Sequence, residues 1–79
     1  MIDLTEYERG LHVAAEIADG HAKMGRDSGA GGHTQSSVAA FIEQKMIESF
    51  KGRGVSDEDV SAFLRWRHVR WYGEGANND

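Results

Sequence analysis

The sequence predicts an all-α fold, namely a small three-helix domain with a C-terminal helical hairpin and a Gly-rich loop between the first two helices. Three observations favour this fold. The 79 residues contain no proline, which suits uninterrupted helices. Apolar side chains recur at helical spacing in three segments that glycines separate, and no stretch shows strand-like alternation. A chain of this length is expected to form one domain, residues 1–79.

The first helix is predicted over residues 4–24, with Asp3 or Thr5 as its N-cap. Its main apolar face consists of Leu4, Tyr7, Leu11, Ala14, Ala15, Ala18 and Ala22, and Val13, Ile17 and Met24 form a second stripe beside it. The apolar arc therefore covers about half of the circumference, which is wider than the stripe of an ordinary surface helix. This excess favours a homodimer or an obligate protein partner.

A Gly-rich loop is predicted over residues 25–35, and the second helix follows over about residues 36–51. Val38, Ala39, Ile42, Met46 and Phe50 share the apolar face of that helix, and Gly52 is expected to end it. Phe41 lies on the opposite side. There it either contacts a partner or packs under the glycine loop.

The third helix is predicted over residues 56–72, followed by a polar tail over residues 73–79. Ser56 is its expected N-cap, and Asp57, Glu58 and Asp59 place carboxylates in the first turn. Val55 and Val60 occupy the two positions of a hydrophobic staple.

The third helix has two apolar sides, one with Val60, Phe63, Leu64 and Trp71 and the other with Ala62, Trp66 and Val69. A three-helix chain gives each helix one inner side, so we expect the Trp66 side to meet a partner or a second subunit. Arg67 is predicted to reach the rim of the core or to pair with a carboxylate such as Glu43. Trp66 and Arg70 are spaced to stack as a cation–π pair.

Arginine and tryptophan are enriched at the energetic centres of protein interfaces. The residues predicted to contact a partner are Trp66, Arg70, Arg67, Trp71, Arg65 and Phe41. The formal charge of −4 argues against a general nucleic-acid binder, although the C-terminal third is locally basic.

Residues 46–65 resemble a helix-turn-helix motif, because the run from Gly54 to Ser61 is similar to the Gly-Val-Ser-x-x-x-Val-Ser pattern of the bacterial repressor family. The resemblance implies that Gly54 lies at the turn and that Val60 and Phe63 occupy the buried positions of the recognition helix. Four residues of the first half depart from the pattern, namely Ser49, Phe50, Gly52 and Arg53. Asp57, Glu58 and Asp59 would also face phosphates, which repel carboxylates.

Other kinds of site find little support in the sequence. The chain has no cysteine, and its glycine loop lacks the Gly-Lys-Ser/Thr of a phosphate-binding loop. His12, Glu16 and Asp19 share one polar helix face as a possible ligand edge, but no helical zinc or di-iron pattern is present. We expect no catalytic residues, no metal and no cofactor.

The sequence therefore predicts a small non-catalytic protein-binding module that regulates or inhibits a larger complex. Compact acidic proteins of this kind are common in phages and mobile elements, so an inhibitor of a host defence or regulatory machine would fit. The alternatives are a helix-turn-helix transcriptional regulator and a structural homo-oligomer component. No apolar run reaches the length of a membrane span, and we expect the protein to act in the cytoplasm.

Overall fold

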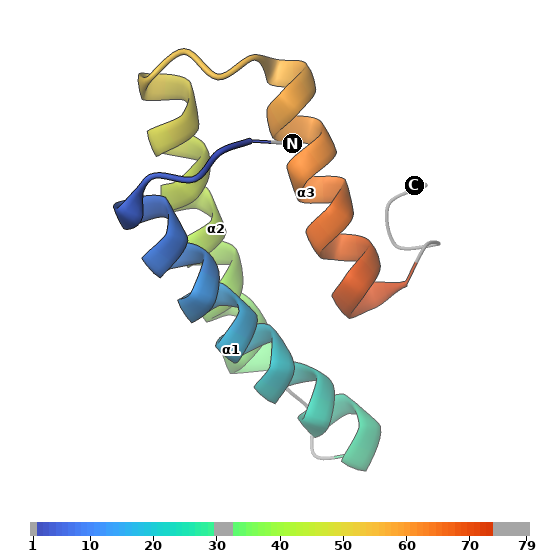
Figure 1. The fold of residues 1–79 in the computed structure, drawn as a ribbon. Helices are drawn as coiled ribbons and strands as arrows, with labels where there is room; N and C mark the ends of the chain where they lie inside the picture. The colour runs from blue at the N-terminus through green and yellow to red at the C-terminus, as the bar shows by residue number, and fades with distance from the viewer. Residues whose placement is uncertain (1, 30–32, 74–79) are drawn as a thin grey trace.

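The computed structural model describes residues 2–29 and 33–73. These residues form three helices and no strand, which confirms the all-α prediction. Helix α1 spans Glu6–Ser28, α2 spans His33–Gly52 and α3 spans Asp57–Tyr72 (Figure 1). None of the three combines the length and the apolarity that crossing a membrane requires. Residues 74–79 of the predicted tail lie outside the described residues.

Helix α1 begins at a capping box. The Thr5 hydroxyl accepts a hydrogen bond from the Glu8 N–H, and the Glu8 carboxylate accepts one from the Thr5 N–H, each at 3.1 Å. The helix continues beyond its predicted end, through part of the expected loop, to Ser28. Gly29 then adopts a left-handed conformation with φ of 79°, which only glycine adopts without strain. Residues 30–32 of the predicted loop lie outside the described residues.

Helix α2 ends at Gly52, but the residue with positive φ is Gly54, at 82°. The Val55 N–H donates to the Phe50 carbonyl at 2.9 Å, which is the long hydrogen bond of a Schellman turn. Ser56 then caps α3 as predicted, because its hydroxyl accepts from the Asp59 N–H at 3.2 Å.

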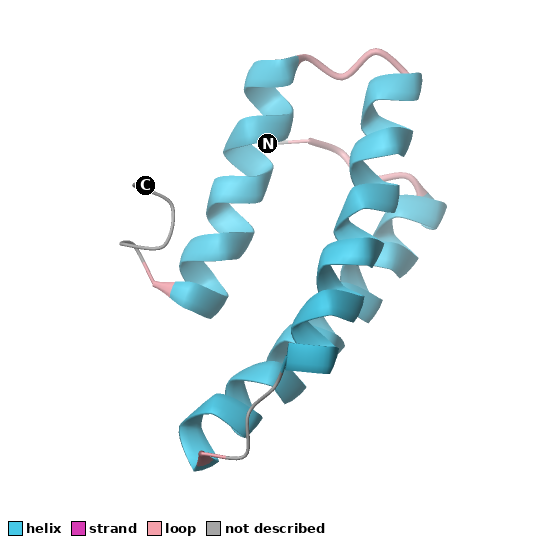
Figure 2. Cartoon of the chain, turned by 180° about the vertical axis from the view of Figure 1, so that it is seen from behind, coloured by secondary structure: helices cyan, strands magenta, loops and turns pink. Residues whose placement is uncertain are grey.

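Helices α1 and α2 pack most closely, side by side and in opposite directions, whereas α3 returns along the pair at a greater separation (Figures 1 and 2). The sequence predicted the hairpin of the second and third helices, but it did not predict that the first two helices pack most closely. The side chains explain the difference. Ala15, Ala22 and Ala39 are buried and let the α1 and α2 backbones approach, whereas α3 meets the pair through the larger Phe63 and Arg67.

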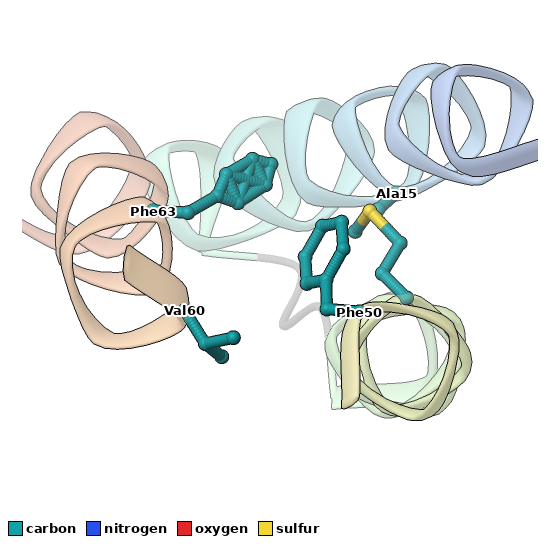
Figure 3. Close-up of a cluster of buried hydrophobic side chains, with 5 residues drawn as sticks. Ala15, Phe50, Val60 and Phe63 are labelled. Atoms are coloured by element: carbon teal, nitrogen blue, oxygen red, sulfur yellow. The ribbon is translucent and has the colours of Figure 1, made fainter. Parts of the chain in front are cut away.

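The apolar core is one small cluster, formed by Ala15, Met46, Phe50, Val60 and Phe63 (Figure 3). The rings of Phe50 and Phe63 meet edge to face, with centroids 5.5 Å apart. Val55, the outer member of the predicted staple, packs against this cluster, which contains the inner member, Val60. Phe63 and Val60 are thus the buried apolar anchors of α3.

Part of the predicted apolar surface stays in solvent. Val13, Ile17 and Met24, the second stripe of the first helix, are each more than half exposed. Val38 belongs to the predicted apolar face of α2 but is 48% exposed. The helical periodicity of α2 is correct, but its buried face is centred on Ala39 and Met46.

A buried carboxylate joins the start of α1 to the end of α2. The Glu8 side chain is fully buried and receives two hydrogen bonds from Arg53, at 2.7 and 2.9 Å. The Ser49 hydroxyl donates to the same carboxylate at 2.5 Å, and Arg53 also donates to the Asp3 carbonyl at 2.8 Å. These bonds hold the N-terminal segment against the second helix.

Candidate functional site

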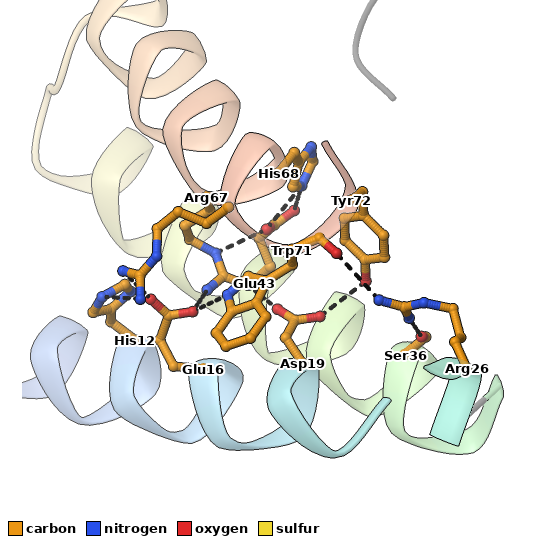
Figure 4. A network of polar contacts seen from close by, with 11 residues as sticks. His12, Glu16, Asp19, Arg26, Ser36, Glu43, Arg67, His68, Trp71 and Tyr72 are labelled. Carbon is orange, nitrogen blue, oxygen red and sulfur yellow. Dashed lines mark hydrogen bonds and ion pairs between the residues drawn. The ribbon is translucent and has the colours of Figure 1, made fainter. Parts of the chain in front are cut away.

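The inner face of α3 is anchored by Arg67, which is only 1% exposed. Its guanidinium donates to three carboxylates: Asp19 at 2.6 Å, Glu43 at 3.1 Å and Glu16 at 3.2 Å (Figure 4). Two of these carboxylates come from α1 and one from α2, so a single side chain ties α3 to both helices. A buried charge of this kind is stable only when such partners surround it.

Three neighbours on α3 complete this polar network. The Trp71 indole N–H donates to Glu16, and the Tyr72 hydroxyl donates to Asp19 at 2.9 Å (Figure 4). His68 Nε2 lies 3.0 and 3.1 Å from the two Glu43 oxygens. Each carboxylate that meets Arg67 therefore has a further partner on α3.

Burial, and secondarily the hydrogen bond to Asp19, raise the pKa of Tyr72, because both disfavour the phenolate. The guanidinium of Arg26 also lies over the Tyr72 ring, 4.9 Å from the ring centroid. Arg26 donates in turn to the Trp71 carbonyl at 3.2 Å, near the end of α3. These contacts fix the last turn of α3 on the end of α1.

The network leaves only a small hollow of about 50 Å³, lined mainly by Asp19, Ser36, Glu43, Arg67 and Tyr72. Such a volume accommodates ordered water more readily than an organic ligand. In the described residues, no set of His, Asp and Glu side chains is arranged to hold a metal ion. Glu16 and Asp19 of the possible ligand edge instead bind Arg67.

His12, the third member of that edge, is half-buried on the polar face of α1. Its ring packs against both Phe63 and Trp66, with centroid distances of 5.6 and 5.7 Å. The pKa of His12 is lowered, chiefly because burial disfavours the charged ring, with Arg67 and Arg70 adding to the effect and Glu16 opposing it. The neutral imidazole acts here as an aromatic support.

The outer face of α3 presents Trp66. Its indole stacks on Phe63 at 5.9 Å and 27°, and the guanidinium of Arg70 lies 5.0 Å from its ring centre, as the sequence predicted. Trp66 nevertheless stays 38% exposed. Arg70 Nη1 lies 2.9 Å from Glu16 Oε1, which fixes the cation against the indole. The result is a large aromatic side chain held rigidly with one side in solvent.

The five predicted contact residues on α3 thus fall into three groups. Trp66, Arg65 and Arg70 are exposed on α3. Trp71 is half-buried with its N–H bonded, and Arg67 is buried. Placing Arg67 on a contact surface is wrong, because three carboxylates hold it inside.

Phe41 lies apart from that group, on α2, and is 65% exposed. The ammonium group of Lys45 sits 5.3 Å from its ring centre. The ring is therefore a separate exposed aromatic on the middle of α2.

Sequence reasoning found Glu43 as a partner of Arg67 but missed Glu16 and Asp19 in that role. Both were noted on one polar face of the first helix, and their spacing of three residues was the available signal. The Glu8–Arg53 pair was also missed, since its members lie 45 positions apart.

The resemblance to a helix-turn-helix motif stays a prediction. Helices α2 and α3 run back along each other through the turn at Gly54 (Figures 1 and 2). Asp57, Glu58 and Asp59 are all exposed at the start of α3, where a recognition helix would approach phosphates.

Comparison with protein-family models, with curated proteins and with solved structures finds no match to this chain.

Proposed function

We propose that this chain is a small non-catalytic protein-binding module that acts in the cytoplasm and regulates or inhibits a larger complex through the outer face of α3. The observation that carries the proposal is Trp66, exposed on one side and fixed on the other by Phe63, His12 and Arg70. Preorganised aromatic and arginine side chains lose little entropy on binding and dominate many interfaces.

The charge of the surrounding surface also supports the proposal. Residues 61–72 contain three arginines and no acidic residue, on a chain of net charge −4. Arg67 is neutralised inside, which leaves Arg65 and Arg70 to face solvent. The small size and acidic charge of the chain resemble those of phage and mobile-element proteins that inhibit host machinery. The most specific form of the proposal is therefore an inhibitor of a host defence or regulatory machine.

The test is affinity capture from a lysate of the native host, with tagged wild-type protein and with the Trp66→Ala variant. We expect a stoichiometric protein that survives nuclease treatment, with its affinity lowered by about 2 kcal/mol or more in Trp66→Ala. Tyr7→Ala is the matched control, because Tyr7 is an exposed aromatic on α1.

Two outcomes would contradict the proposal. If nuclease releases everything that wild type retains, the chain binds nucleic acid and the helix-turn-helix alternative replaces the proposal. If Trp66→Ala and Tyr7→Ala retain the partner equally, α3 is not the contact surface. Circular dichroism of both variants shows whether they are folded.

A further inference from the structure

The outer face of α3 carries a narrow apolar strip formed by Ala62, Trp66 and Val69. Their spacing of four and three residues places them on one side of a helix. Ala62 and Trp66 are exposed and Val69 is half-buried. A strip of this spacing is the surface through which one helix packs against another.

Charged residues flank the strip in a particular order. At 100° per residue, Glu58 and Arg65 lie along one edge of the strip, and Asp59 and Arg70 lie along the other. On each edge the acidic residue is near the start of α3 and the arginine is nearer its end. All four residues are exposed.

We propose that this face pairs with the same face of a second copy of the chain, with the two α3 helices antiparallel about a two-fold axis near Phe63. Such an axis is perpendicular to both helices. It places each edge of the strip beside the same edge of the second copy, and the two edges run in opposite directions. Glu58 then faces Arg65 of the second copy, and Asp59 faces Arg70 of the second copy. A parallel pair would instead bring like charges together.

The side-chain sizes along the strip suit the same arrangement. With the axis near Phe63, Ala62 of each copy lies close to the axis, where a small side chain allows the helices to approach. Trp66 of each copy then covers the strip on either side of that contact.

The exposed apolar stripe of α1 does not carry the same argument. Val13, Ile17 and Met24 have charged residues along one edge only, because Gly10, His21 and Ser28 lie along the other. On the charged edge, Glu16 is already bound by Arg67 and Arg70, and Lys23 pairs with Asp27 within the helix. The charge order that selects a second copy as the occupant is found on α3.

This inference rests on the proposed function, because it uses the contact surface proposed there. A second copy and another protein would compete for Trp66. The two proposals fail separately: a chain that stays monomeric but captures a partner through Trp66 contradicts only the pairing of α3 helices.

The experiment uses single-cysteine variants of the full chain, which has no cysteine of its own. Ala62→Cys, Val69→Cys and Val13→Cys are oxidised with diamide, and covalent dimer is followed on non-reducing gels. We expect Ala62→Cys to cross-link at least about tenfold faster than the other two. In the antiparallel pair the two 69 positions lie roughly 18 Å apart along the helices, from the rise of 1.5 Å per residue, beyond the reach of a disulfide.

Two cross-linking results would overturn the inference. Equal rates for all three variants mean random collision, since Val13 lies on the exposed stripe of α1. Fast cross-linking at both 62 and 69 means a parallel pair.

Charge-reversal variants test the antiparallel pairing independently of the cross-linking. Glu58→Lys and Arg65→Glu each replace an exposed residue, and each should weaken self-association about tenfold in sedimentation velocity, because two like-charge contacts replace two ion pairs. An equimolar mixture of the two variants should recover the wild-type association. If both variants associate like wild type, or the mixture does not recover, the proposed pairing is wrong.

Discussion

Replacing Arg67 with alanine should lower the free energy of unfolding by about 3–5 kcal/mol, the usual cost of removing one partner from a buried ion pair. The loss is large because Glu16, Asp19 and Glu43 would stay between the helices without their shared cation. A domain of this size is typically stable by about 4–12 kcal/mol, so the variant should lose a large share of its stability. Urea denaturation followed by far-UV circular dichroism measures the change.

Two matched variants separate the geometry of Arg67 from its charge. Arg67→Lys keeps the charge but cannot donate to three carboxylates at once, so its loss should be intermediate. Arg65→Ala removes an exposed arginine from the same helix and should change stability by no more than about 0.5 kcal/mol. If Arg67→Ala and Arg65→Ala were equally stable, the network would not be what anchors α3.

Acid should remove the second large contribution to stability, that of Glu8. The hydrogen bonds from Arg53, joined by those from Ser49 and the Thr5 N–H, outweigh burial and lower the pKa of Glu8 from 4.5 to about 2. Because the folded pKa lies below the unfolded one, the carboxylate stabilises the fold fully above about pH 4.5. That contribution, about 3 kcal/mol, is lost as the pH falls towards 2.

The Glu8→Gln variant isolates this effect from the other carboxylates. At pH 7 it should be less stable than wild type, and the gap should narrow as the pH falls from 4.5 to 2. Thermal unfolding at a series of pH values measures the gap. A gap that stays constant across this range would show that Glu8 titrates alike in the folded and unfolded chains.

Local features of the fold could be predicted where a few neighbouring residues decide the structure. The cap at Ser56 depends on the residues of one turn, and both its position and its hydrogen bond to the Asp59 N–H are as expected. The end of α1 could not be predicted in this way. Glycine composition suggested a break after residue 24, whereas an ion pair between Lys23 and Asp27 at 2.7 Å and the left-handed Gly29 place the end at Ser28.

The packing of the helices depended on contacts that local patterns do not contain. Periodicity identified apolar faces, but it could not rank how closely the three helices approach one another. Buried alanines on α1 and α2 decide that ranking in favour of the α1–α2 pair. The partners of Arg67 show the same limit: Glu16 and Asp19 lie 51 and 48 positions away, and only the folded chain brings them together.

The sequence predicted part of the candidate site. Its composition identified Trp66 and Arg70 as contact residues, and their spacing predicted the cation–π contact. Sequence could not tell which arginine of α3 turns inward. That choice follows from the position of Phe63 and Val60 in the core, which sets the rotation of the helix and places Arg67 against the carboxylates.

A backbone amide NMR titration of the ¹⁵N-labelled chain with the protein that it captures would locate the contact surface residue by residue. We expect chemical-shift changes concentrated on the outer face of α3, around Ala62, Trp66 and Val69, with little change along Val13, Ile17 and Met24 of α1. Changes confined to that stripe of α1, or to the surroundings of Phe41 on α2, would contradict that expectation.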